Sequence, residues 1–225
     1  MIYVPHGNSP EKNAAMRALG AELVEHGHDF QAAREEAGRV AVAEGLHFVP
    51  AFHPDLVLGV ATYWAELFHA VPDLAVAYVP IGQGSGACAA VAARNALAPR
   101  TRIVGVVSAH APCYARSVEA GHPVEAPTTT RLADGVACRV PDPDALDVIS
   151  REVERIVEVT DAEVAAAMRL IFATTHNVAE GAGAAALAGA WQERDRLSGA
   201  RTAVTITGGN VDTEQLARVL AGADS

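Results

Sequence analysis

Short apolar runs alternate with longer segments of helical periodicity along nearly the whole chain. Runs at residues 75–81 (AVAYVPI), 102–107 (RIVGVV) and 155–160 (RIVEVT) have the length and β-branched content of buried strands. An Ala-rich segment follows the first of these runs, and residues 161–177 read as another helix. Strands that alternate with helices in this way favour an α/β fold, with a parallel sheet and flanking helices.

The first part of the chain repeats this alternation on a smaller scale. Three predicted strands lie at residues 2–5 (IYVP), 21–27 (AELVEHG) and 46–52 (LHFVPAF). Ser9 and Asp29 are predicted to begin the two helices between them, and Gly20 and Gly45 to end those helices. His53-Pro54-Asp55 then breaks the pattern. We therefore expect a partial small lobe over residues 1–54 and a larger, ligand-binding lobe over residues 55–225.

A glycine loop directly follows the apolar run at residues 75–81. Because glycines allow tight turns and close approach, and because the first amides of a helix have no intrahelical partner, this strand–loop–helix unit predicts an anion site. The loop consists of Gly82, Gln83, Gly84, Ser85 and Gly86. A second glycine motif, Thr207-Gly208-Gly209-Asn210, closes the last predicted strand at residues 202–209. Two such motifs in one parallel sheet suggest that a single ligand is held at both ends.

Composition narrows the classes of partner. The chain has 225 residues, half of them hydrophobic, and a net charge of −10 from 17 basic and 27 acidic residues. Without a basic cluster we expect no nucleic acid and no anionic membrane as a partner. We find no run long enough for a bilayer span and no secretory signal, so the expected location is cytoplasmic. Cys88, Cys113 and Cys138 form no metal or disulfide motif and are expected to be small buried thiols.

Two ligands fit the glycine loop. Gly82-x-Gly84-x-x-Ala87 matches a dinucleotide fingerprint, but the next predicted strand ends in Val107-Ser108 and lacks the expected ribose-binding carboxylate. The other ligand is pyridoxal phosphate. Its phosphate would bind the loop amides, and the hydroxyl of Thr207 would meet the pyridine nitrogen. A neutral hydroxyl at that position suits β-elimination better than transamination.

At this point the chain resembles a known family. The stretches SPEKNAAMRALGAELV, VPIGQGSG, LADGVAC, RIVEVTDAEVAAAMRLIF, HNVAEGAGAAALAG and TITGGNVD, in this order, are similar to the threonine/serine dehydratases, pyridoxal-phosphate enzymes of fold type II. The resemblance implies that residues 82–86 hold the phosphate, that Thr207 and Gly208 form the wall at the ring, and that Glu180 supports the cofactor pocket. Asp134 and Gly135 would lie near the mouth of the site. A hydroxy amino acid is the implied substrate.

The chain also departs from this family. Gln83 and Ser85 replace two glycines of the phosphate loop, and the region after the strand at 102–107 lacks the acidic metal ligands of some members, so we expect no metal. His110, at the end of that strand, is a candidate substrate contact. The family's Schiff-base lysine motif does not occur in the sequence. The only lysine, Lys12, is expected to be a solvated residue at the start of a helix.

These observations lead to one hypothesis and two alternatives. We expect a truncated dehydratase that keeps the phosphate and ring subsites but has lost its catalytic amine, so that no catalytic residue is identified. The family resemblance predicts a homodimer, or a chain completed by a missing N-terminal segment in trans. The alternatives are a non-catalytic module that binds pyridoxal phosphate or an amino acid, and a nicotinamide-dependent oxidoreductase.

Overall fold

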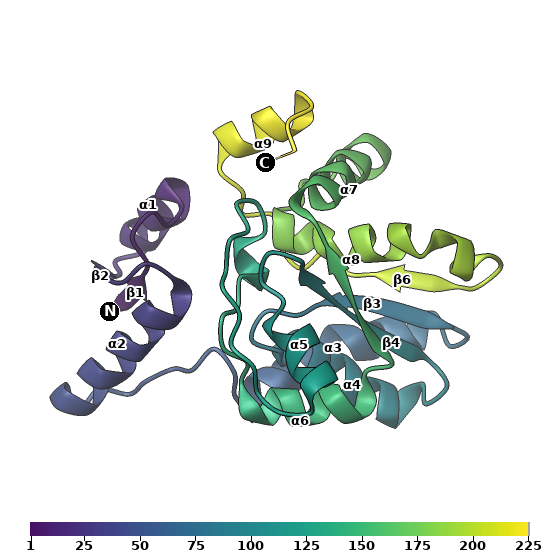
Figure 1. Ribbon diagram of the computed structural model, residues 1–225, viewed down its shortest axis with the longest axis horizontal. Coiled ribbons are helices and arrows are strands. Elements are labelled where there is room, and N and C mark those ends of the chain that lie inside the picture. The colour runs from purple at the N-terminus through teal and green to yellow at the C-terminus, as the bar shows by residue number, and fades with distance from the viewer. Residues whose placement is uncertain (225) are drawn as a thin grey trace.

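The computed structural model describes residues 1–224 and contains two parallel sheets (Figure 1). We use "first lobe" for residues 1–53, which hold a two-stranded sheet, and "large lobe" for residues 54–224, which hold a four-stranded sheet. The first lobe contains β1 (Ile2–Val4), α1 (Pro10–Ala18), β2 (Leu23–Glu25) and α2 (Phe30–Glu44). The large lobe contains α3 (Pro54–Ala70), β3 (Val76–Pro80), α4 (Ser85–Leu97), β4 (Arg102–Ser108), α5 (Cys113–Ala120), η1 (Asp134–Val136), α6 (Pro143–Glu152), β5 (Arg155–Val159), α7 (Asp161–Thr175), α8 (Gly181–Gln192), η2 (Arg194–Leu197), β6 (Thr202–Val204) and α9 (Thr213–Leu220).

The strand order in the large lobe is β5-β4-β3-β6, and every pair is parallel. Successive residues of β3 point to opposite faces of the sheet. Ala77 and Val79 pack in a core with α3 and α4, whereas Val76 and Tyr78 pack in a second core with α7 and α8. Because helices cover both faces, β3 is buried along its whole length. The predicted α/β fold with a parallel sheet is confirmed.

Several element ends follow the predicted local chemistry. The side chain of Asp29 accepts a hydrogen bond from the backbone of Ala32 at 2.8 Å and so begins α2, and Gly45 ends that helix at a φ of 65°. Ser9 caps α1 in the same way. Thr160 and Glu163 form a reciprocal capping box at the start of α7.

Two predicted strands are wrong in whole or in part. Residues 46–50 form no strand, and residues 47–52 make no backbone–backbone hydrogen bond within the described chain, because no neighbouring strand lies beside them. The last strand ends at Val204 instead of continuing to Gly209. Its pairing with β3 stops at Tyr78, and the next β3 residue that would face β6 is Pro80, which has no N–H to donate.

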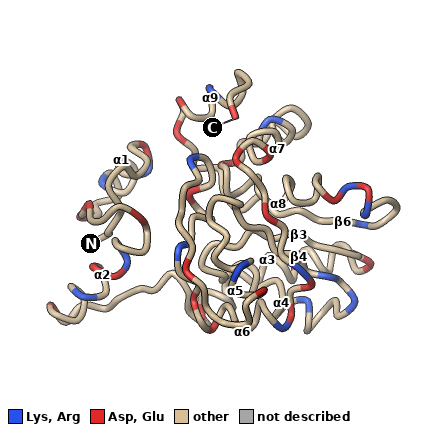
Figure 2. Tube along the Cα trace, viewed as in Figure 1, with Lys and Arg blue, Asp and Glu red and all other residues tan. Residues whose placement is uncertain are grey.

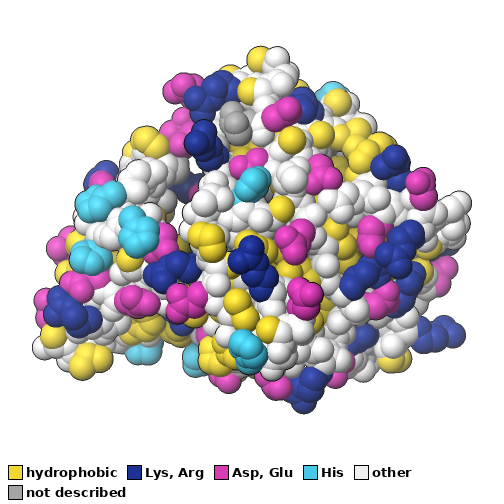
Figure 3. Space-filling view, viewed as in Figure 1, with side chains coloured by type: hydrophobic (Ala, Val, Ile, Leu, Met, Phe, Trp, Pro, Cys, Tyr) yellow, Lys and Arg dark blue, Asp and Glu magenta, His cyan; other side chains and the backbone are white. Residues whose placement is uncertain are grey.

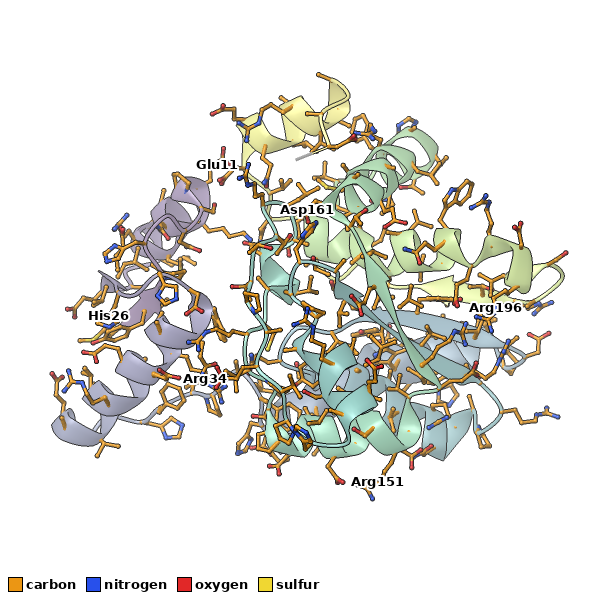
Figure 4. All side chains as sticks on the ribbon, viewed as in Figure 1. Glu11, His26, Arg34, Arg151, Asp161 and Arg196 are labelled. Atoms are coloured by element: carbon orange, nitrogen blue, oxygen red, sulfur yellow. The ribbon has the colours of Figure 1, made fainter. Side chains whose placement is uncertain are left out.

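Polar contacts join the two lobes. Arg139 donates to Asp29 at 2.6 Å, and Arg34 on α2 donates to Gln83 at 3.0 Å. Figure 4 shows Arg34 on the side of α2 that faces the large lobe, and Glu11 on α1 beside the C-terminal helix. Basic and acidic residues are interspersed along both lobes (Figure 2). No helix within residues 1–224 has both the length and the apolar content needed to cross a membrane.

Candidate functional site

A cavity of about 600 Å³ lies at the carboxyl end of β3, where β6 separates from the sheet. Three parts of the large lobe form it: the loop between β3 and α4, the segment that follows β6, and one side of α3. The lining residues are Val60, Tyr63, Leu67, Pro80, Gly82, Gln83, Gly84, Ser85, Gly86, Gly135, Val136, Ala182, Thr205, Ile206 and Thr207. All five predicted loop residues, and Thr207, therefore line the same space.

Steric constraints explain the glycines of this loop. Gly84 has a φ of +98°, and a Cβ there would lie 2.5 Å from the Cβ of Ala145. A Cβ on Gly82 would overlap the carbonyl oxygen of Gly135 on the opposite wall. Both positions require glycine, one for its backbone conformation and its contact, the other for a close approach of two backbones.

The start of α4 offers unpaired backbone donors to the cavity. The first bonded N–H of the helix belongs to Cys88, which donates to the carbonyl of Gly84 at 2.9 Å. The amides of Ser85, Gly86 and Ala87 precede it and have no intrahelical acceptor. None of the lining residues given above has a charged side chain. The positive end of the α4 dipole and these amides are thus the groups that would attract an anion here.

Gln83 replaces a glycine of the family pattern, and its side chain has partners in both lobes. Its amide oxygen accepts from Arg34 at 3.0 Å, and its amide nitrogen lies 2.9 Å from the sulfur of Cys138. Its backbone carbonyl accepts from the hydroxyl of Tyr114 at 2.9 Å. These contacts fix the middle of the loop and connect it to the first lobe.

The second glycine motif packs against the start of α8. A Cβ on Gly208 would lie 2.5 Å from the Oε1 atom of Glu180, and a Cβ on Gly183 would overlap the carbonyl of Gly208. The backbone N–H of Glu180 donates to that same carbonyl at 3.0 Å. Glu180 and Gly208 lie directly behind Thr207, outside the cavity lining, and fix the backbone of the wall.

Lys12 is not the solvated residue that we expected. Its Nζ atom donates to Asp134 at 2.8 Å and to Glu180 at 3.0 Å, across 122 and 168 residues of sequence. Partial burial alone would lower the pKa of Lys12, but the hydrogen bonds and charges of the two carboxylates outweigh burial and raise it. Lys12 therefore links α1 to two of the predicted site residues.

The remaining predicted residues occupy different places. Gly135 lines the cavity, while Asp134 lies outside the lining and bonds Lys12. His110 is exposed and outside the lining, and its carbonyl accepts from the backbone of Thr129 at 2.8 Å. The three cysteines are buried, as predicted. Burial raises the pKa of the Cys88 thiol to about 12, so the helix terminus does not activate it.

The apolar wall of the cavity was missed at the level of sequence. Val60, Tyr63 and Leu67 of α3 line it. Their spacing of three and four residues does indicate one face of a helix. The signal was present but is shared by every amphipathic helix, so it could not single out a ligand wall.

Comparisons with known proteins agree with this site. The family model for "Pyridoxal-phosphate dependent enzyme" matches residues 1–208. The L-threonine ammonia-lyase of Geobacter sulfurreducens is 33% identical over 220 residues, which is 97% of this chain and 55% of that protein. The corresponding protein of Thermotoga maritima is 30% identical over 223 residues, again 97% of this chain and 55% of that protein. The chain thus spans about half the length of these curated relatives.

Solved structures show the same fold. The processed form of threonine deaminase isoform 2 from Solanum lycopersicum superposes with a TM-score of 0.88 at 27% identity, covering 99% of this chain and 66% of that one. A bacterial threonine deaminase, from T.th., superposes with a TM-score of 0.83 at 30% identity, covering 93% and 69%. The glycine loop, the cavity at the carboxyl end of β3 and these matches lead to one conclusion: the chain belongs to the family of pyridoxal-phosphate-dependent enzymes of fold type II, among homologues of the threonine dehydratases.

Proposed function

We propose that this chain forms the pyridoxal-phosphate-binding part of a threonine or serine dehydratase and that it lacks the amine needed for catalysis on its own. The observation that carries the proposal is the single cavity lined by both residues 82–86 and Thr207. A further support is the activity of the relatives, which are threonine ammonia-lyases. The proposed substrate class is therefore a β-hydroxy amino acid.

The residues of the cavity fit the chemistry of this cofactor. The free amides at the start of α4 would hold the phosphate, with charge-assisted hydrogen bonds of about 1.5–3 kcal/mol each. The hydroxyl of Thr207 would pair with the ring nitrogen, and the side chains of Val60, Tyr63 and Leu67 would shield the ring from water. When bound, the cofactor supplies an electron-accepting ring for β-elimination. The role of this chain is to bind and orient it.

The amine is the missing part. Lys12 is the only lysine in the sequence, and both of its carboxylate partners hold it as an ammonium ion. An ammonium has no lone pair with which to attack an aldehyde or to take a proton. We therefore expect reversible cofactor binding and no turnover from the 225 residues alone.

The test combines binding with covalent trapping. The protein is titrated with pyridoxal phosphate by absorbance and then treated with borohydride, and the adduct is counted by mass spectrometry. L-threonine and L-serine are supplied in parallel, and keto acid is measured. We expect saturable binding that Gly84→Ala abolishes, no adduct at Lys12 and no keto acid. An adduct at Lys12 near one per chain, with turnover, would overturn the proposed loss of catalysis, and absence of saturable binding would overturn the cofactor site.

One alternative draws on the same observation. A formed cavity without an amine also suits a non-catalytic module that binds pyridoxal phosphate or an amino acid. The two differ when the family's lysine-bearing portion is supplied as a second polypeptide. Keto acid production in that mixture supports the incomplete dehydratase, whereas unchanged binding without product supports the non-catalytic module.

A further inference from the structure

A groove of about 430 Å³ crosses the first lobe, away from the cofactor cavity. It lies between β1 and the segment after α2, and the residues lining it are Met1, Ile2, Tyr3, Phe30, Arg34, Ala37, Val40, Ala41, Leu46, His47, Phe48, Val49 and Ala51. Large apolar side chains are exposed in it, including Leu46 at 49% and Val49 at 71%. Figure 3 shows hydrophobic side chains along the lower edge of this lobe, where α2 and the following segment lie.

One side of the groove is the free edge of β1. Ile2 donates its N–H to Glu22 and Val4 accepts at its carbonyl from His26, so these two residues face β2. Backbone groups of successive strand residues point in opposite directions. The N–H and carbonyl of Tyr3 therefore point away from β2, where the described chain offers them no backbone partner.

The other side is residues 46–51, the segment that the sequence predicts as a strand. Its residues 47–51 make no backbone–backbone hydrogen bond with any described residue. Figure 1 shows this segment as an irregular connection that runs from α2 toward α3. The groove is thus bordered by backbone donors and acceptors on both sides, and another backbone is the partner that satisfies such groups in series.

The floor of the groove is one side of α2. Phe30, Arg34, Ala37 and Ala41 recur at helical spacing, and Val40 lies beside them. Phe30 is 40% exposed, so this stripe is left partly uncovered. A strand laid between β1 and residues 46–51 would place apolar side chains on that stripe, as a sheet does on the helix that covers it.

The size of the relatives indicates what fills this space. This chain spans 55% of the Geobacter sulfurreducens relative and 66% of the Solanum lycopersicum structure, so the family's fold includes polypeptide that these 225 residues do not contain. From the two open backbone edges, the apolar floor and this difference in length, we infer that the groove binds one β-strand of a second polypeptide, inserted between β1 and residues 46–51, and that this polypeptide is the uncontained portion of the fold. The inference depends on family membership and does not require cofactor binding.

The test supplies that portion in trans. The protein is co-expressed, without added pyridoxal phosphate, with the segment of the Geobacter sulfurreducens relative N-terminal to its matched region. We expect a one-to-one complex on size exclusion. In the complex, hydrogen exchange at the amides of Tyr3 and of residues 47–49 is expected to slow by about 10-fold or more, as for amides that join a sheet.

Matched variants on α2 separate groove binding from other contacts. Val40→Glu places a charge on the floor and is expected to prevent the complex, while Val42→Glu, at a position 87% exposed and outside the groove, is expected to leave it intact. Circular dichroism confirms that both variants remain folded. A complex that forms without slowed exchange at these amides, a complex insensitive to Val40→Glu, self-association through the groove, or no soluble complex would each overturn the inference.

Discussion

The two sheets of this molecule share parallel pairing but differ in how they are covered. In the large lobe, β3 has a strand on each side and a layer of helices on each face, and all five of its residues are buried. In the first lobe, the buried hydrophobic residues are Val4, Ala33 and Ala41. The backbone geometry of the cofactor cavity is therefore built on a packed sheet, whereas the first lobe has an open edge and is held by polar contacts. A two-stranded sheet alone is marginally stable.

The difference also separates two ways of forming a site. In the large lobe, van der Waals limits fix the walls, because the glycines at 82, 84, 183 and 208 leave no room for a side chain. The first lobe contributes side chains at the ends of long contacts: Lys12 to Asp134 and Glu180, and Arg34 to Gln83. Packing tolerates little change, whereas ion pairs at a surface contribute about 1 kcal/mol or less each.

The largest effect is expected from Gly84→Ala in the large lobe. The new Cβ forces a left-handed residue and overlaps Ala145, at a combined cost of about 2–4 kcal/mol in unfolding free energy. Urea unfolding measures the loss, and a titration with pyridoxal phosphate measures the accompanying loss of binding. Gly199→Ala is the control, because that glycine has a φ of +76° and nothing within 4 Å of its Cβ position. Equal losses in both variants would show that the contact with Ala145 contributes nothing.

A second effect concerns an ion pair inside the large lobe. Hydrogen bonds from Arg155 lower the pKa of Glu193 to about 2. Because the folded-state pKa lies below that of the unfolded chain, this contribution to stability is complete above about pH 4.5 and is lost as the pH falls toward 2. Glu193→Gln is therefore expected to destabilise the protein at about pH 6 and to reduce its further loss of stability between about pH 4.5 and about pH 2.5.

Thermal unfolding across that pH range measures the Glu193 effect. Glu154→Gln is the matched control, since Glu154 pairs with the same arginine from a more exposed position. An unchanged pH profile in Glu193→Gln would contradict the assigned role of this carboxylate.

The smallest effect on global stability is expected from Lys12→Met at the contact between the lobes. The loss in unfolding free energy should be about 1 kcal/mol or less, but the amides of α1 should exchange faster, because the link to Asp134 and Glu180 is lost. Arg17→Met is the control, since Arg17 pairs only with Glu25 in its own lobe at 3.5 Å among the described residues. Faster exchange of equal size in both variants would place the link elsewhere.

Local chemistry made much of this fold predictable. Asp29, Gly45 and the Thr160–Glu163 box act over a few residues, and the structure confirms each of them. The strand at residues 46–52 was wrong because a strand is completed by its neighbour, and composition does not show whether that neighbour is present. The early end of β6 depends on Pro80 in another strand, which acts only once the register is known.

The candidate site divides along the same line. The glycine loop and Thr207 follow predicted strands, so a parallel sheet brings them to one edge. The contacts of Lys12 could not be predicted, because its partners lie 122 and 168 residues away and no short-range pattern connects them. The same holds for Gln83, whose partner Arg34 belongs to the first lobe.

The most direct test of the central claim is to map pyridoxal phosphate onto the protein by amide chemical shifts. We expect saturable shifts at residues 82–87 and 205–208, with the unmodified protein recovered on dialysis. Shifts that leave the loop unchanged, or that centre on Lys12 with a covalent adduct, would contradict the proposed cofactor site.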